Sequence, residues 1–121
     1  SRCFTARHYN LPKDNCEFRC LQHPDGMELR SRESQELFRI NGISTLSGSR
    51  YDLMRELPEM ARMGVSTVRL SPEHQGMEEV VRRFDQIRRG ELPATDPLNL
   101  VEAPPCNGYW YGKPGMDLVP T

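Results

Sequence analysis

The chain has 121 residues, 16 Lys and Arg against 17 Asp and Glu, and a net charge of −1. This length fits one domain or part of one. The near-neutral charge argues against a protein that coats DNA or RNA, because such proteins need a basic excess to release counterions. No apolar run reaches the eighteen residues that a membrane-spanning helix needs. Four cysteines are too few for a disulfide-dense miniprotein.

Turn-forming residues dominate the N-terminal stretch and predict a loop over most of 1–20. A hairpin is predicted next, with strands at 17–22 and 27–32, because Pro24-Asp25-Gly26 between them is a strong turn sequence. Residues 37–45 predict one further strand, with Gly42 near its end or at a bulge.

In the middle of the chain, the spacing of apolar residues predicts mainly helices. Ser49 is expected to cap a helix, and Pro58 is expected to kink it or to divide it into two short helices. A short buried strand is predicted at 65–70, and Ser71-Pro72 resembles a helix start. The clearest helix covers about 76–89, since its apolar residues recur at spacings of three and four and Gly90 follows them.

This order of elements predicts an α/β fold with parallel strand pairing. We expect three segments: a cysteine loop and hairpin at 1–36, a β-α-β-α region at 37–90, and a Pro-rich tail at 91–121. Two such β-α units cannot bury both faces of a parallel sheet. The chain is therefore expected to be a fragment of a larger α/β protein, for example a barrel, with a β-hairpin excursion.

Cys3, Cys16 and Cys20 have the spacing C-x12-C-x3-C, and three interpretations compete. Disulfides are one, although Cys16 and Cys20 would lie about 13 Å apart on an extended segment and could meet only if it turns. A structural zinc site is the second, with His8 or His23 completing a Cys3His set. An iron–sulfur cluster is the third, because its irons need thiolates, usually four. Nearby cations would offset the cluster's negative charge (Arg2, Arg7, Lys13 and Arg19).

Two groups of motifs carry a resemblance to a known family. The specific group is Arg2-Cys3-Phe4-Thr5-Ala6-Arg7-His8, followed by Lys13-Asp14-Asn15-Cys16-Glu17-Phe18-Arg19-Cys20. The second group comprises Asn41-Gly42-Ile43-Ser44-Thr45-Leu46-Ser47, Met63-Gly64-Val65, Arg69-Leu70-Ser71-Pro72 and Cys106-Asn107-Gly108-Tyr109-Trp110. Together they resemble the UbiV-like branch of the collagenase-like peptidase U-32 family, along nearly the whole chain.

The resemblance implies an iron–sulfur protein of oxygen-independent ubiquinone biosynthesis. It also implies that the chain is the C-terminal part of a (β/α) barrel-like domain. It implies a 4Fe–4S cluster on four cysteines, of which three match Cys3, Cys16 and Cys20, with the fourth ligand expected upstream of residue 1. Cys106 is expected to be a buried thiol rather than the missing ligand. The implied partners are a homologous UbiU-like subunit, a ubiquinone precursor and a prephenate-like small molecule as the oxygen source. A cytoplasmic location, with no direct nucleic-acid contact, is expected.

The sequence leaves three different functions open. The family label suggests a peptidase, but the sequence has no Ser-His-Asp arrangement and no HExxH pair. An RNA-hydroxylating relative is the second such function, and a structural zinc module is the third. No catalytic residue is assigned. Arg69 and Asn41 are substrate-binding candidates, because each lies near the end of a predicted strand, where barrel enzymes carry their reactive groups. His74 is expected to be an ordinary surface residue.

Overall fold

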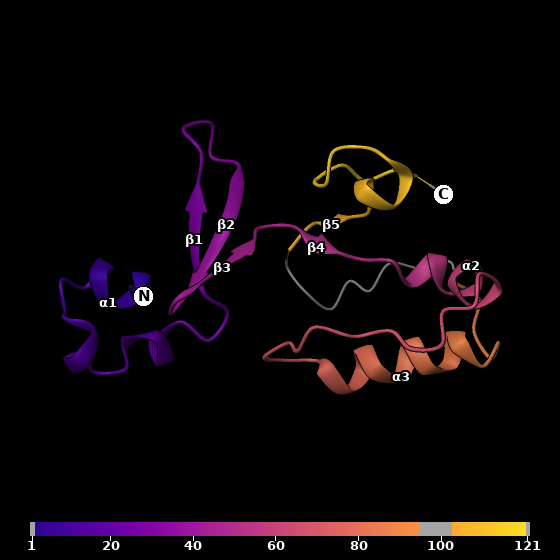
Figure 1. Cartoon of the computed structure of the whole chain (residues 1–121), viewed down its shortest axis with the longest axis horizontal. Coiled ribbons are helices and arrows are strands. Elements are labelled where there is room, and N and C mark those ends of the chain that lie inside the picture. The colour runs from indigo at the N-terminus through magenta and orange to yellow at the C-terminus, as the bar shows by residue number, and fades with distance from the viewer. Residues whose placement is uncertain (1, 95–102, 121) are drawn as a thin grey trace. The chain divides into compact units, whose positions relative to one another are not determined.

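The computed structural model describes residues 2–94 and 103–120 (Figure 1). The chain is mixed α/β and divides into two compact units, Ser1–Ser49 and Arg50–Thr121, which we describe separately. None of the helices within the described ranges is long and apolar enough to cross a membrane.

A three-stranded antiparallel sheet forms the centre of the first unit. Its strands are β1 (Met27–Arg30), β2 (Glu36–Asn41) and β3 (Ser44–Ser47), in that order across the sheet. The predicted hairpin is wrong in one strand, because residues 19–22 form the 3-10 helix η2 (Arg19–Gln22) and β1 pairs with β2 instead. Positive φ angles at Glu17 and Phe18 prevent an extended strand there.

The single strand predicted at 37–45 is two strands. Asn41 ends β2 opposite Ser44 at the start of β3, and Gly42 between them has φ +60°. A positive φ in the first central position of a two-residue connection closes a tight hairpin, and glycine adopts it without steric cost. Gly42 thus follows directly on the end of β2, which is one of the two predicted places for it, and forms a turn with Ile43 rather than a bulge.

A short helix, α1 (Phe4–His8), lies against this turn (Figure 1). The Gly42 carbonyl accepts hydrogen bonds from the N–H groups of Phe4 (2.9 Å) and Thr5 (3.4 Å), and the Gly42 N–H donates to Thr5 Oγ1 (3.0 Å). The predicted loop over 1–20 is therefore wrong for these residues. A 3-10 turn, η1 (Lys13–Asn15), follows.

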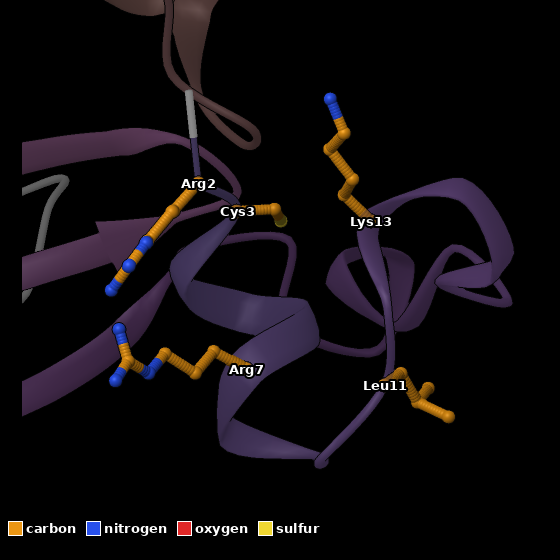
Figure 2. Close-up of a pocket in the computed structure, with 5 residues that line it drawn as sticks. All are labelled: Arg2, Cys3, Arg7, Leu11 and Lys13. Atoms are coloured by element: carbon orange, nitrogen blue, oxygen red, sulfur yellow. The ribbon is translucent and has the colours of Figure 1, made fainter.

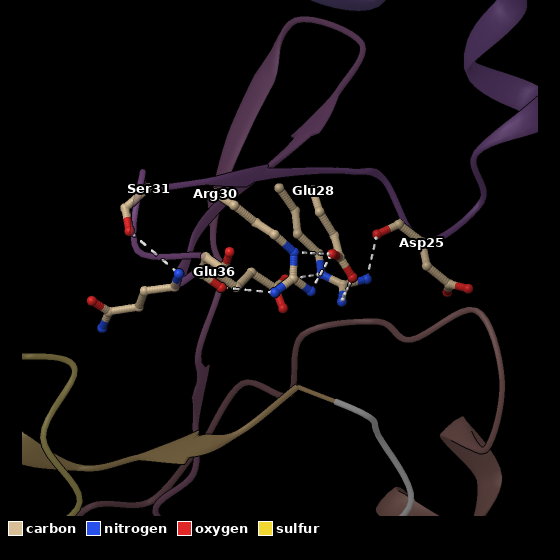
Figure 3. Close-up of polar contacts among 8 residues, drawn as sticks. Asp25, Glu28, Arg30, Ser31 and Glu36 are labelled. Atoms are coloured by element: carbon tan, nitrogen blue, oxygen red, sulfur yellow. Dashed lines mark hydrogen bonds and ion pairs between the residues drawn. The ribbon is translucent and has the colours of Figure 1, made fainter.

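One face of the sheet carries a ladder of charges (Figure 3). Glu28 accepts from Arg30 at 2.5 Å and lies 3.4 Å from Arg39, whose Nε is 2.6 Å from Glu36 Oε1. The hydrogen bond that Arg39 donates to Glu36 is the largest cause that raises the pKa of Arg39 above its usual value. The ladder keeps this face polar, and its four charged side chains are all paired with one another.

The second unit contains the two longest helices, α2 (Leu57–Arg62) and α3 (Met77–Arg88). It also has the 3-10 helices η3 (Met54–Glu56) and η4 (Gly108–Tyr111), and a two-residue parallel pair joins β4 (Arg50–Tyr51) to β5 (Pro105–Cys106). The division into two short helices at Pro58 and the long helix ending before Gly90 are confirmed. Their buried apolar side chains form one core: Met54, Leu57, Val80 and Ile87.

Three predictions for residues 49–72 are wrong. Residues 65–70 form no strand, since Val65 and Val68 are more than 40% exposed and have no partner strand in the described ranges. Ser71-Pro72 does not start a helix, because α3 begins after Gly76. The expected cap at Ser49 is also wrong: Asp52 Oδ1 accepts the Met54 N–H at 3.0 Å and begins η3.

Within the tail of the second unit, Asn107 holds the last part of the chain. Its side chain donates to the Val119 carbonyl (3.0 Å) and accepts from the Val119 N–H (2.7 Å). Gly108 is required beside it, because the Pro114 carbonyl occupies the space that a Cβ would need. Tyr111 donates to the buried carboxylate of Glu56 at 2.7 Å, and this bond raises the pKa of the Tyr111 hydroxyl.

Replacing the most buried core residue, Met54, which is 1% exposed, tests the core of the second unit. We expect Met54→Ala to lower the free energy of unfolding by about 2–5 kcal/mol, because it removes buried methylenes and leaves a cavity. Met63→Ala is the matched control, since Met63 is 57% exposed, and it should change stability by less than about 0.5 kcal/mol. Urea denaturation measures both; equal effects would contradict this core.

Replacing Thr5 tests the docking of α1 on the β2–β3 turn. Thr5→Val keeps the shape but removes the acceptor of the Gly42 N–H, which should cost about 1–3 kcal/mol. The Gly42 amide should then exchange with solvent faster, as NMR hydrogen exchange measures. Thr5→Ser keeps the hydroxyl and should preserve the protection; equal loss of protection in both variants would refute the contact.

Candidate functional site

Cys3 lies at the start of α1, where its side chain caps the helix. The Ala6 N–H points at Cys3 Sγ at 3.5 Å, and the residue is half-buried. Because α1 is anchored on Gly42, the thiol has a defined position in the first unit. The strongest motif of the resemblance and the Asn41-Gly42-Ile43 motif therefore meet in space.

A hollow of about 340 Å³ opens beside this thiol (Figure 2). Arg2, Arg7 and Lys13 line it together with Cys3 and Leu11. Figure 2 shows the two guanidinium groups extending from the same side of α1, and the Cys3 thiol pointing toward the segment that carries Lys13. None of these three cations forms an ion pair with a carboxylate in the described ranges. The hollow is accordingly an unneutralised cationic site with a thiol at its wall.

Cys16 and Cys20 are joined by a turn rather than by an extended segment. The backbone of Cys16 has a right-handed helical conformation, whereas Glu17 (φ 55°) and Phe18 (φ 50°) have left-handed φ angles. The Arg19 N–H donates a hydrogen bond to the Cys16 carbonyl at 3.4 Å. Two left-handed non-glycine residues cost about 1–2 kcal/mol each. The chain therefore turns between Cys16 and Cys20, as it must if the two cysteines are to approach each other.

The same turn leaves backbone donors unused. Within the part of the chain that the structure describes, the N–H groups of Glu17 and Phe18 donate to no acceptor. A right-handed residue followed by a left-handed one forms the concave backbone called a nest, whose N–H groups bind anions, including iron–sulfur centres. Thiolate sulfurs or sulfide are therefore suitable acceptors at this turn.

An aromatic cluster connects the two cysteine-bearing regions. Tyr9 Oη lies 2.5 Å from His23 Nε2, the two rings stack with centroids 5.9 Å apart, and the Arg19 guanidinium lies 5.3 Å from the Tyr9 ring centroid. His8 contacts Tyr9 edge-on at 5.1 Å. Because Tyr9 occupies His23 Nε2, that nitrogen is not available to complete the zinc site considered from the sequence.

The three cysteines share one unit, but they do not form a finished metal site. Cys3, Cys16 and Cys20 are free thiols and all are half-buried. Among residues 2–94 and 103–120, no three His, Cys, Asp or Glu side chains converge closely enough to hold a metal ion. The donor set suits a thiolate-bound metal, since three free sulfurs and unused N–H groups lie on short turns. Binding would have to draw these turns together.

Cys106 differs from the other three cysteines in its location and its burial. It lies in the second unit, is 4% exposed and forms β5 against β4. Burial, and next the negative charge of Asp52, raise the pKa of its thiol above the usual value. The expected buried thiol is confirmed, and a protonated buried thiol is a poor metal ligand.

The substrate-binding candidates do not form a recognisable site. Asn41 does end a strand, β2, but it is exposed at the hairpin turn. Arg69 is exposed on an irregular segment, because the strand on which its prediction depended is absent there. The two residues belong to different units. His74 is exposed, in agreement with an ordinary surface role.

Sequence reasoning misses the contact between Tyr9 and His23. The residues are fourteen positions apart, and no periodicity relates a helix end to the end of a distant 3-10 turn. The sequence marks His23 only as a potential zinc ligand. The sequence analysis does identify Arg2, Arg7 and Lys13 as cations near the cysteines. It does not predict that they line one hollow, because the hollow depends on α1 and the sequence predicts a loop there.

No protein-family model matches the chain, and no solved structure matches it.

Proposed function

We propose that this chain is part of an iron–sulfur subunit of an O2-independent hydroxylation system in ubiquinone biosynthesis. In this proposal Cys3, Cys16 and Cys20 supply three of the four ligands of a 4Fe–4S cluster, and the fourth comes from elsewhere. The observation that carries the proposal is the turn from Cys16 to Cys20, with its positive φ angles and unused N–H groups. Strained backbone of this kind occurs at functional sites.

Thiol chemistry favours an iron–sulfur cluster over a zinc ion. The unit offers three accessible cysteines, and the Nε2 atom of its His23 is already hydrogen-bonded to Tyr9. A Cys3His zinc site would require His8 or the remaining nitrogen of His23. When bound, an iron–sulfur cluster supplies one-electron transfer. The chain's own residues would hold its sulfurs and donate N–H hydrogen bonds to them, which tunes the reduction potential.

The cations beside Cys3 have two compatible roles. A cluster bound by thiolates carries negative charge, and Arg2, Arg7 and Lys13 have no carboxylate to neutralise them in the described ranges. The same groups suit the carboxylates of the prephenate-like oxygen source, because an arginine fork binds a carboxylate through two hydrogen bonds. They are better substrate-binding candidates than Asn41 and Arg69, since a cavity of about 340 Å³ brings them together.

The rest of the proposal follows from the resemblance. It comprises a (β/α) barrel-like domain completed by chain outside this sequence, a UbiU-like partner subunit and a cytoplasmic location. A peptidase activity has no support in the described residues, because none of the contacts there joins a serine or cysteine nucleophile to a histidine base.

Metal analysis of the anaerobically prepared protein tests the proposal. We expect a brown protein after reconstitution with ferrous iron, sulfide and a small thiol that can act as a fourth sulfur ligand. Iron and sulfide should be present in nearly equal amounts, with a thiolate–iron charge-transfer band. Zinc in place of iron would instead establish a zinc module. Absence of any bound metal would refute the proposal.

Paired serine substitutions identify the ligands. Cys16→Ser should reduce bound iron to less than half of the wild-type amount, because a ligand is lost. Cys106→Ser should leave it unchanged, since that thiol is buried in the other unit. Iron determination with circular dichroism as a folding control measures both variants. Equal loss of iron from both would overturn the ligand assignment.

A further inference from the structure

We infer that Tyr9 and His23 are positioning residues of the cysteine site: their hydrogen bond holds the turn that begins at Cys3 against the turn that contains Cys20. The relevance to metal binding rests on the proposed function. The positioning itself is a property of the metal-free chain and can be measured without metal.

Each member of the pair is fixed through the backbone to one cysteine-bearing turn. Tyr9 ends α1, because its N–H donates to the Ala6 carbonyl at 3.1 Å, and Cys3 caps the other end of this five-residue helix. His23 ends η2, and its N–H donates to the carbonyl of Cys20 itself at 3.0 Å. A contact between the two side chains therefore fixes Cys20 relative to Cys3.

Hydrophobic burial cannot fix this arrangement. Neither η1 nor η2 has a buried residue, and the apolar side chains of the second turn, Phe18 and Leu21, are 70% and 79% exposed. A segment without buried apolar surface has little to hold it against its neighbours. In the part of the chain that the structure describes, the side-chain interactions between α1 with its end and this segment are those of Tyr9: the 2.5 Å hydrogen bond and stacking with His23, and the Arg19 guanidinium 5.3 Å from its ring.

The Arg19 guanidinium strengthens the contact between Tyr9 and the turn that contains Cys20. Arg19 lies between Cys16 and Cys20 in the sequence and is held by Glu17 through bonds of 3.1 and 2.9 Å. A guanidinium over an aromatic ring gains about 0.5–1 kcal/mol at exposed sites. Tyr9 thus contacts two residues of the segment from Glu17 to His23, and its hydroxyl is the directional part of this contact.

The hydrogen bond defines what a substitution removes. The bond joins Tyr9 Oη to His23 Nε2, and the tautomer of the imidazole sets which of the two atoms donates. Tyr9→Phe deletes the hydroxyl and keeps the ring, so stacking survives. His23→Gln keeps a hydrogen-bonding amide at nearly the place of Nε2 and should retain most of the effect, whereas His23→Leu removes the hydrogen-bonding group.

The test measures the effective concentration of Cys3 and Cys20 toward each other. Both remain as the only thiols in a Cys16→Ser/Cys106→Ser background, and the disulfide between them is equilibrated with reduced and oxidised glutathione. We expect Tyr9→Phe and His23→Leu to lower this effective concentration roughly 2- to 10-fold, the loss typical of one hydrogen bond. Tyr109→Phe is the control, since Tyr109 is 75% exposed, and it should have no effect.

The outcomes separate the two proposals. Effective concentrations that match the wild type in both Tyr9→Phe and His23→Leu would overturn the positioning role, whatever the metal content. A loss in these variants with recovery in His23→Gln supports it, even if the wild type binds no iron. In reconstituted protein with all four cysteines, Tyr9→Phe should also release iron to a chelator faster and alter the electron paramagnetic resonance line shape, which a general loss of stability would not change.

Discussion

The backbone of Gly42 determines the arrangement of the first unit. Its carbonyl receives the first N–H groups of α1, and its N–H is bound by the Thr5 hydroxyl. Only Thr5, Ala6 and Ser49 have buried side chains among the described residues of this unit. Polar contacts therefore carry much of the positional information that an apolar core provides in larger domains.

A unit held in this way can rearrange around a ligand at small cost. The Cys16–Cys20 turn has no buried side chain and contains two strained residues, so little packing is lost if it moves. In the function that we propose, metal binding would provide the free energy that ordering the turn requires, as it does in small metal-binding domains. This explains how three thiols can share a unit without forming a finished site in the metal-free chain.

The sequence predicted the elements whose signals are local. The periodicity that ends at Gly90 predicted α3, and Pro58 predicted a division into two short helices. It did not predict which segments pair: β1 pairs with β2, whereas residues 19–22 form the 3-10 helix η2. A short apolar run such as 65–70 does not show by itself whether it is buried, because burial depends on its neighbours in the fold. The contact of Tyr9 with His23 depends on two turns, and turns have no periodicity that the sequence reveals.

The motifs that carry the family resemblance differ in what they do. Asn41-Gly42-Ile43 forms the turn on which α1 rests, and Cys106-Asn107-Gly108 holds the chain's tail through Val119 and a position with no room for a Cβ. Both therefore have complete structural explanations and say nothing about chemistry. The turn from Cys16 to Cys20 is a different case, because it has positive φ angles at Glu17 and Phe18 and no buried side chain in return. Backbone strain of this kind is a feature of functional sites, and it is the physical argument for the ligands that we propose, Cys3, Cys16 and Cys20.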